Sequence, residues 1–175
     1  MIELHFDINR YLYIILLAML PQIKNTNENK SPIIYPELDF KMNFDGCSKG
    51  NPGLGGAGAV IYHDGDEIWS ESFFVGETTT NNNAEYAGLI LGLQKAVQMN
   101  IKILLVEGDS QLVINQMTGK YKCNSPNLIA LYERAKELEK NFEKVYYQHI
   151  LRNFNKRADY LSNIPIEEYY KNKKN

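Results

Sequence analysis

The chain has 175 residues, a net charge of −2 and a pI near 5.9. That length suits one domain with its own core, and the mild acidity weighs against a strongly basic nucleic-acid binder. Nucleic acid is not excluded as a partner, because bound divalent cations change the sign of an acidic site. Cys47 and Cys123 lack metal-ligand spacing and fit unpaired thiols in a reducing compartment. We therefore expect an intracellular protein, cytoplasmic, or nuclear in a eukaryote.

Residues 1–37 are expected to form an N-terminal extension that ends near Glu37. Its apolar run, Tyr11–Leu20, is far short of the ~20 residues that a membrane-spanning helix needs, so no membrane partner is expected. The run fits a packed helix or strand, a cleaved or anchoring signal, or a non-native start, and these alternatives stay open. Residues 25–30 are polar and fit a flexible linker.

From Leu38 the pattern becomes regular, and the first half of the domain fits three strands. Alternating apolar and polar residues over Leu38–Asp45 predict a strand with one buried face, which Asp45 ends on its polar side. The Gly/Pro run Gly50–Gly56 predicts a long turn. Two further strands, joined by the strong hairpin signal Asp64-Gly65, are predicted over Ala57–His63 and Glu67–Val75.

The second half alternates helices with strands. We predict a well-buried helix over Asn83–Met99, a central strand over Ile101–Glu107 and a helix over Asp109–Met117 closed by Gly119. Ser125-Pro126 predicts the start of an amphipathic helix, followed by a strand over Glu143–Leu151 and a closing helix over Asn155–Asn163 capped by Asn155. The order is β-β-β-α-β-α-α-β-α, an α/β domain over residues 38–165 with a polar tail over 166–175.

Four acidic residues stand inside distinctive motifs. They are Asp45 in Asp-Gly-Cys-Ser-Lys-Gly-Asn-Pro-Gly, Glu85 in Thr-Asn-Asn-Asn-Ala-Glu-Tyr, Asp109 in Gly-Asp-Ser-Gln-Leu-Val and Asp159 in Asn-Lys-Arg-Ala-Asp-Tyr-Leu. Carboxylate oxygens are the ligands that Mg²⁺ prefers, and four of them together can hold two ions for phosphodiester cleavage. Four unrelated acids would instead be solvated surface residues. The motifs favour a shared site.

Over residues 38–163, the order and spacing of these motifs resemble type 1 ribonuclease H, in particular its plant and archaeal branch. The resemblance implies a five-stranded mixed sheet, three antiparallel strands followed by two parallel ones, flanked by helices. It implies an endonuclease that hydrolyses the RNA strand of RNA/DNA hybrids, leaving 5′-phosphate and 3′-hydroxyl ends. Two Mg²⁺ ions, with Mn²⁺ as a substitute, are the implied cofactors, and a monomer that needs no small-molecule cofactor is expected. The basic protrusion of some bacterial members is missing, so we expect modest, salt-sensitive affinity.

The resemblance also implies roles for individual residues. Asp45, Glu85, Asp109 and Asp159 would bind the metal ions, with Asp45 shared by both. His149 would assist proton transfer or product release, although it also fits the end of a strand. Substrate contacts are implied for Gly46, Ser48, Asn51, Asn81, Asn82 and Gln111, for Thr80 at a DNA phosphate, and for Lys120, Lys122 and Arg152 at other phosphates. Turn formation by Asn51 and helix capping by Asn81 or Asn82 are the plainer alternatives.

Two residues depart from the family pattern. Leu54 replaces a frequent proline, and Ser162 stands where alanine is common. We expect neither to touch the metal chemistry. Because a fold alone does not prove activity, the alternatives are a non-catalytic nucleic-acid-binding module or another nuclease of the superfamily.

Overall fold

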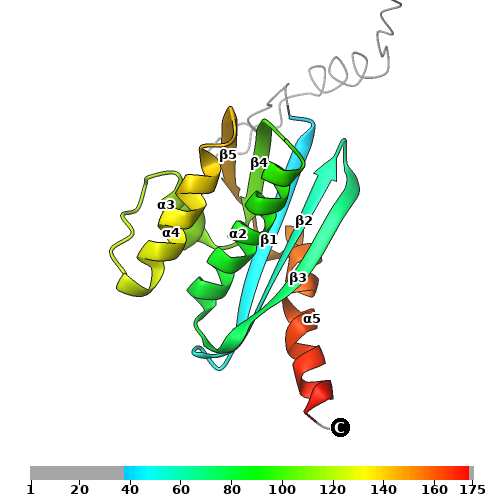
Figure 1. Ribbon diagram of the computed structural model, residues 1–175, viewed down its shortest axis with the longest axis vertical. Coiled ribbons are helices and arrows are strands. Elements are labelled where there is room, and N and C mark those ends of the chain that lie inside the picture. The colour runs from blue at the N-terminus through cyan, green and yellow to red at the C-terminus, as the bar shows by residue number, and fades with distance from the viewer. Residues whose placement is uncertain (1–37, 174–175) are drawn as a thin grey trace, which may run out of the picture. The chain divides into compact units, whose positions relative to one another are not determined.

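A computed structural model of the chain describes residues 38–173, and the predictions for residues 1–37 lie outside this range. Five strands form one mixed sheet in the order β3-β2-β1-β4-β5 (Figure 1). β1, β2 and β3 are antiparallel, whereas β4 pairs parallel with β1, and β5 parallel with β4. The strands are β1 Phe40–Lys49, β2 Gly53–His63, β3 Asp66–Thr79, β4 Ile103–Gly108 and β5 Lys144–His149. The predicted fold class and order of elements are confirmed.

Helices cover both faces of the sheet. They are α2 Asn81–Gln98, α3 Gln111–Met117, α4 Pro126–Glu139 and α5 Lys156–Asn172, with a short 3₁₀ turn η1 at Arg152–Phe154. α2 packs on β1, β2 and α4, and α5 packs on β1, β2 and β3 (Figure 1). Odd and even residues of β1 therefore meet different helices: Met42 lies against Gly92 of α2, and Asp45 contacts Ser162 of α5.

The prediction that Asp45 ends the first strand on a solvated face is wrong. β1 continues to Lys49, pairing with β2 as far as Leu54. Asn43 and Asp45 are only 5% and 3% exposed. α5 covers the face that the alternating pattern marked as polar, so these polar side chains are buried and need partners there.

The connections follow backbone requirements, with one change from the predicted limits. Asp64 and Gly65 both have positive φ, 51° and 93°, as a type I′ hairpin needs. Gly119 closes α3 with φ 74°. The predicted turn over Gly50–Gly56 is shorter than expected, because β2 already begins at Gly53 and its glycines pair with β1 and β3.

α5 extends to Asn172, beyond its predicted end at Asn163 and through most of the predicted polar tail. Ile166 is 1% exposed, and the Tyr169 ring stacks on Phe74 of β3 with 5.1 Å between centroids. Tyr169 Oη also donates to Glu77 Oε1 at 2.6 Å. These contacts with β3 stabilise helical turns that the polar sequence did not predict.

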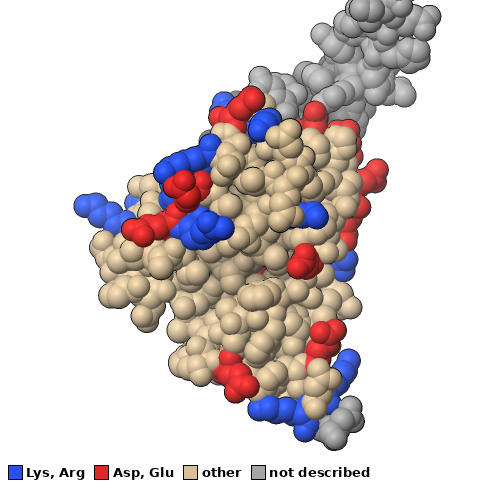
Figure 2. Space-filling view, viewed as in Figure 1, with Lys and Arg blue, Asp and Glu red and all other residues tan. Residues whose placement is uncertain are grey.

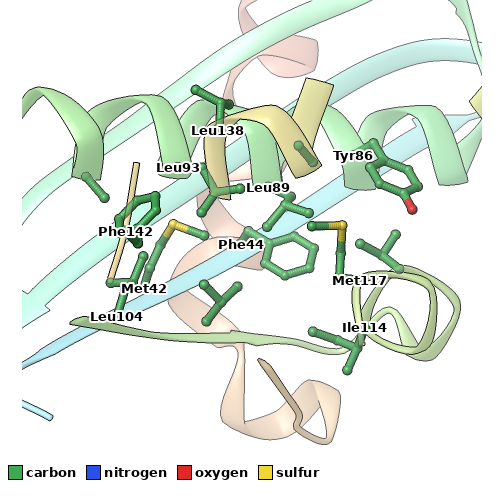
Figure 3. Packing of buried hydrophobic residues seen from close by; sticks show 14 of the residues in the cluster. Met42, Phe44, Tyr86, Leu89, Leu93, Leu104, Ile114, Met117, Leu138 and Phe142 are labelled. Atoms are coloured by element: carbon green, nitrogen blue, oxygen red, sulfur yellow. The ribbon is translucent and has the colours of Figure 1, made fainter. Parts of the chain in front are cut away.

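The main core lies between the sheet and the helices α2 and α4. Met42, Phe44, Leu89, Leu93 and Leu104 are fully buried there. Their side chains point toward one another between α2, β1 and β4 (Figure 3). Burying a side chain of this size contributes about 1.5–3 kcal/mol, so this layer fixes where β1 and α2 lie.

On the face of the molecule that carries α2 and α4, cationic and anionic side chains are interspersed around a largely uncharged centre (Figure 2). Within residues 38–173, none of the helices has the length and apolar character needed to cross a membrane.

We predict that Gly58→Ala strongly destabilises the fold. A Cβ at Gly58 would lie 2.5 Å from Leu161 Cβ and 2.6 Å from the Ser162 nitrogen, so α5 would have to move off β2. Overpacking of this kind costs about 1–3 kcal/mol or more. Gly65→Ala is the matched control, because it meets no atom within 4 Å and carries only the strain of its positive φ. Urea unfolding measures both, and equal losses would contradict the close packing of α5.

Candidate active site

The site lies where two parallel strands separate. β1 pairs with β4 as far as Phe44 and Gly108, and Asp45 and Asp109 are the next residues of each chain segment. A cavity of about 300 Å³ opens here. Its lining residues are Asp45, Gly46, Cys47, Ser48, Lys49, Asn81, Glu85, Asp109 and Arg152. Three of the four predicted acids thus face one cavity.

Glu85 reaches the cavity because β1 contacts the first turns of α2 directly. A Cβ at Gly46 would lie 2.0 Å from the Ala84 carbonyl carbon and 2.1 Å from the Glu85 nitrogen. Only glycine permits this approach. Gly46 therefore has a structural role in placing Glu85, whatever contact it makes with a substrate.

Asp159 joins the site through its neighbours. It lies in the first turn of α5, and its carboxylate forms an ion pair with Arg152, which lines the cavity. Ser162, one turn further along α5, donates its hydroxyl proton to Asp45 Oδ2 at 2.6 Å. Three of the four predicted acids thus line the cavity where β1 and β4 separate, and Asp159 is linked to it through Arg152 and α5.

Burial and mutual repulsion disfavour the charged form of two of these carboxylates. Burial raises the pKa of Asp45 to about 6, against an opposing hydrogen bond from Ser162, and the charges of Asp109 and Asp159 add to the rise. Burial, followed by the charges of Asp45 and Asp109, raises the pKa of Glu85 well above its ordinary value. Glu85 Oε2 is buried without a hydrogen-bond partner. A cation bound here would offset the repulsion between these carboxylates and would give Glu85 Oε2 a partner.

The residues fit a hard divalent cation in kind. All four side chains offer carboxylate oxygens, which Mg²⁺ prefers, and one buried oxygen on Glu85 has no other partner. Within residues 38–173, no three His, Cys, Asp or Glu side chains converge closely enough to form a finished metal centre. Asp159 pairs with Arg152 and does not line the cavity. The site therefore consists of three carboxylates around one cavity, with the fourth beside it.

A polar rim surrounds the acids. The Ser48 amide donates to Asn81 Oδ1 at 2.9 Å, and the Asn81 amide donates to Asn51 Oδ1 at 3.0 Å. Asn51 and Asn81 thus connect the loop after β1 to the start of α2. The expectation that Asn81 or Asn82 caps this helix is wrong: Thr80 is the cap, and its Oγ1 accepts from the Asn83 amide. Asn82 is exposed beside it.

Other predicted residues lie around the site without lining it. His149 is exposed, and its Nε2 lies 3.2 Å from the Asp109 carbonyl oxygen, so its ring is adjacent to the acids. Gln111 is exposed at the start of α3, and Lys120 and Lys122 are exposed between α3 and α4. None of the four lines the cavity. Their proposed roles stay predictions.

The sequence did not predict several residues of this site. Asn155 stands at the N-cap of α5, as predicted, but its side chain makes no cap hydrogen bond. It is 1% exposed, and its Nδ2 lies 2.8 Å from the Phe44 carbonyl and 2.6 Å from Asp109 Oδ1. Ser162 was expected to stay clear of the metal chemistry, and its contact with Asp45 contradicts this. Cys47 and Lys49 also line the cavity.

Comparison with known proteins agrees with this fold and site. The sequence model of a family described as "Reverse transcriptase-like" matches residues 43–164, which include all four acids. The sheet order and the acids where β1 and β4 separate define the chain as a domain of this ribonuclease H-like class.

Individual relatives narrow the class. Ribonuclease HI of Halobacterium salinarum is 38% identical over 138 residues, which are 78% of this chain and 69% of that protein. Bifunctional protein Rv2228c of Mycobacterium tuberculosis is 42% identical over 124 residues, 70% of this chain. This chain spans only 34% of that relative.

Solved structures show the same likeness. The N-terminal ribonuclease H domain of Rv2228c has a TM-score of 0.73 at 36% identity, covering 77% of this chain and 98% of the domain. LC11-RNase H1, solved in complex with an RNA/DNA hybrid, has a TM-score of 0.70 at 33% identity, covering 75% and 99%. The chain therefore belongs to the type 1 ribonuclease H family.

The pKa of Asp45 predicts how stability depends on pH in the metal-free protein. Its pKa is raised from 3.8 to about 6 on folding, so its contribution to stability is present below pH 3.8 and is lost as pH rises through 6. Asn cannot ionise, so the Asp45→Asn variant does not lose this stability as pH rises. The variant should gain up to about 3 kcal/mol in unfolding free energy relative to the parent between pH 4 and pH 7. Urea unfolding in EDTA measures the difference, and a pH-independent difference would contradict the buried, crowded state of Asp45.

Proposed function

We propose that this domain is a metal-dependent endonuclease that hydrolyses the RNA strand of RNA/DNA hybrids and leaves 5′-phosphate and 3′-hydroxyl ends. The observation that carries the proposal is the shared cavity of Asp45, Glu85 and Asp109, rimmed by Ser48 and Asn81. Family membership supports it, since LC11-RNase H1 was solved with such a hybrid.

The four carboxylates would hold two Mg²⁺ ions, or Mn²⁺ as a substitute. Bound there, divalent ions lower the pKa of a water and stabilise charge on the attacking and leaving oxygens. The unpaired oxygen of Glu85 and the raised pKa of Asp45 give both residues a reason to accept a cation. Asp45, which is near the charges of Glu85, Asp109 and Asp159, would be shared by both ions.

Arg152 would bind a substrate phosphate. Its guanidinium lines the cavity and pairs with Asp159. A cation on Asp159 would compete for that carboxylate, and the guanidinium could then bind a phosphate through its planar set of donors. His149, next to the Asp109 backbone, would move a proton or help to release the product.

The polar rim would read the hybrid. Hybrids present 2′-hydroxyls and base edges in a shallow minor groove, and these groups distinguish RNA from DNA. The Asn81 and Asn51 side chains accept hydrogen bonds from the Ser48 and Asn81 backbone amides, and the Ser48 hydroxyl donates to the Thr79 carbonyl. These side chains are thus already ordered and would meet the groove with little loss of side-chain entropy. Gly46, Asn82 and Gln111 are proposed as further contacts, and Thr80 as a contact to a DNA-strand phosphate.

The proposed function predicts metal-dependent cleavage of the hybrid. Purified protein with an end-labelled RNA/DNA hybrid should cut the RNA strand internally in Mg²⁺ or Mn²⁺ and not in EDTA. Asp109→Asn should lose at least about 10³-fold in rate, because charge stabilisation at a developing oxyanion contributes about that much. His149→Ala should slow turnover by about 10²-fold while leaving Mg²⁺ binding intact, as expected for loss of proton transfer.

Matched RNA/RNA, DNA/DNA and single-stranded RNA are the controls for substrate class. Binding of the hybrid without cleavage in any metal would replace the proposal with a non-catalytic binding module. Cleavage of the other substrates at similar rates would point to a different nuclease of the superfamily. Wild-type rates in Asp109→Asn would remove Asp109 from the catalytic set.

The second prediction concerns the basic residues. If Lys120, Lys122 and Arg152 contact phosphates, each alanine variant should weaken hybrid binding and reduce the slope of log K against log salt by up to about one. The measurement is hybrid affinity in Ca²⁺ or in the Asp109→Asn background over a salt series. Lys140→Ala is the control, because Lys140 pairs with Glu137 on the exposed side of α4. A slope unchanged from the parent would exclude the residue concerned.

A further inference from the structure

Ser162 of α5 packs closely against β2, beside Asp45. It is fully buried, and it lies against β2 because the residues facing it there are Gly56 and Gly58. A Cβ at Gly56 would lie 2.1 Å from the Ser162 carbonyl oxygen, and one at Gly58 would lie 2.6 Å from the Ser162 nitrogen. These two glycines are the β2 partners of Cys47 and Asp45. Ser162 of α5 therefore packs closely against the backbone of β2, beside the β1 residues Asp45 and Cys47.

Two side chains of β1 form hydrogen bonds with Ser162. The Cys47 thiol lies 3.3 Å from the Ser162 carbonyl oxygen, and the Ser162 hydroxyl lies 2.6 Å from Asp45 Oδ2. The same hydroxyl lies 2.9 Å from the Asp159 carbonyl oxygen. A hydroxyl can donate only one proton. The Asp45 carboxylate is the stronger acceptor and here the nearer one, so the Ser162 hydroxyl donates its hydrogen bond to Asp45.

We infer that Ser162 is a positioning residue, which fixes the rotation of the Asp45 carboxylate and ties it to the turn of α5 that carries Asp159. This inference rests on the proposed function, in which Asp45 and Asp159 hold divalent cations. A carboxylate oxygen that accepts one hydrogen bond keeps another lone pair. The bond from Ser162 thus leaves Asp45 able to bind a cation while removing a torsional freedom that cation binding would otherwise have to restrict.

This role is specific to the hydroxyl. Alanine, common at this position in the family, would fill nearly the same space and leave Asp45 Oδ2 without this donor. Ser162 makes the only side-chain hydrogen bond to Asp45 found among residues 38–173. Partners of metal-binding side chains typically change metal affinity by about 10–100-fold when removed.

The test is Mg²⁺ binding by calorimetry to the full 175-residue chain without nucleic acid. Ser162→Ala should weaken Mg²⁺ binding at least about tenfold. Ser162→Cys fills the place of the hydroxyl with a slightly larger sulfur and offers only a weak S–H donor, so it should weaken binding to a similar degree. Tyr169→Phe is the matched control, because it removes another 2.6 Å hydroxyl–carboxylate hydrogen bond from α5, outside the site. It should leave Mg²⁺ affinity within about twofold.

Cleavage assays add a second readout. In Ser162→Ala the Mg²⁺ concentration for half-maximal cleavage should rise in parallel with the loss of affinity, while the rate at saturating Mg²⁺ recovers. Circular dichroism checks that each variant folds. If Ser162→Ala does not fold, the Mg²⁺ affinity of Ser162→Cys tests the inference instead.

Several outcomes would overturn the inference. Unchanged Mg²⁺ affinity in Ser162→Ala would exclude it, and wild-type affinity in Ser162→Cys would assign the effect to volume and not to the hydrogen bond. An equal loss in Tyr169→Phe would assign it to general support of α5. If the parent chain binds no Mg²⁺ at all, the two-metal proposal fails and this inference falls with it, a result distinct from an unchanged variant.

Discussion

The burial of several carboxylates at one end of the sheet is the constraint on which the rest of this structure depends. Asp45 and Glu85 have raised pKa values because water is largely excluded from them and because they lie near other acids. Such an arrangement opposes folding. It persists because the core between α2, β1 and β4 fixes the backbone on one face of the sheet and α5 fixes it on the other.

Close backbone contacts convert that scaffold into a site. Gly46 lets α2 bring Glu85 to β1, and Gly58 lets α5 bring Ser162 to Asp45. Neither glycine needs to act chemically. Each permits an approach that a Cβ would block, so the positions of the acids follow from the packing of main chain against main chain.

Three of the acids have an individual partner that holds the side chain. Asn155 donates to Asp109, Ser162 donates to Asp45, and Arg152 pairs with Asp159. Glu85 differs, because it has only a backbone hydrogen bond from Gly46 and its Oε2 is buried with no hydrogen-bond partner. The partners differ in strength as well: a charged guanidinium can be displaced by a competing cation or phosphate, whereas the neutral amide and hydroxyl orient a carboxylate without neutralising it.

The sequence by itself determined the order of elements, the hairpin at Asp64-Gly65 and the identity of the four acids, because periodicity, turn chemistry and local motifs are properties of neighbouring residues. It could not determine that Asn43 and Asp45 are buried, since one strand's alternation does not show that a helix 110 residues later covers its polar face. The length of α5 was missed for the same reason, because Ile166 and Tyr169 are stabilised by β3. Only the tertiary structure decided that Asn155 and Ser162 contact Asp109 and Asp45, because those contacts join residues 46 and 117 positions apart through the packing of α5 on the sheet.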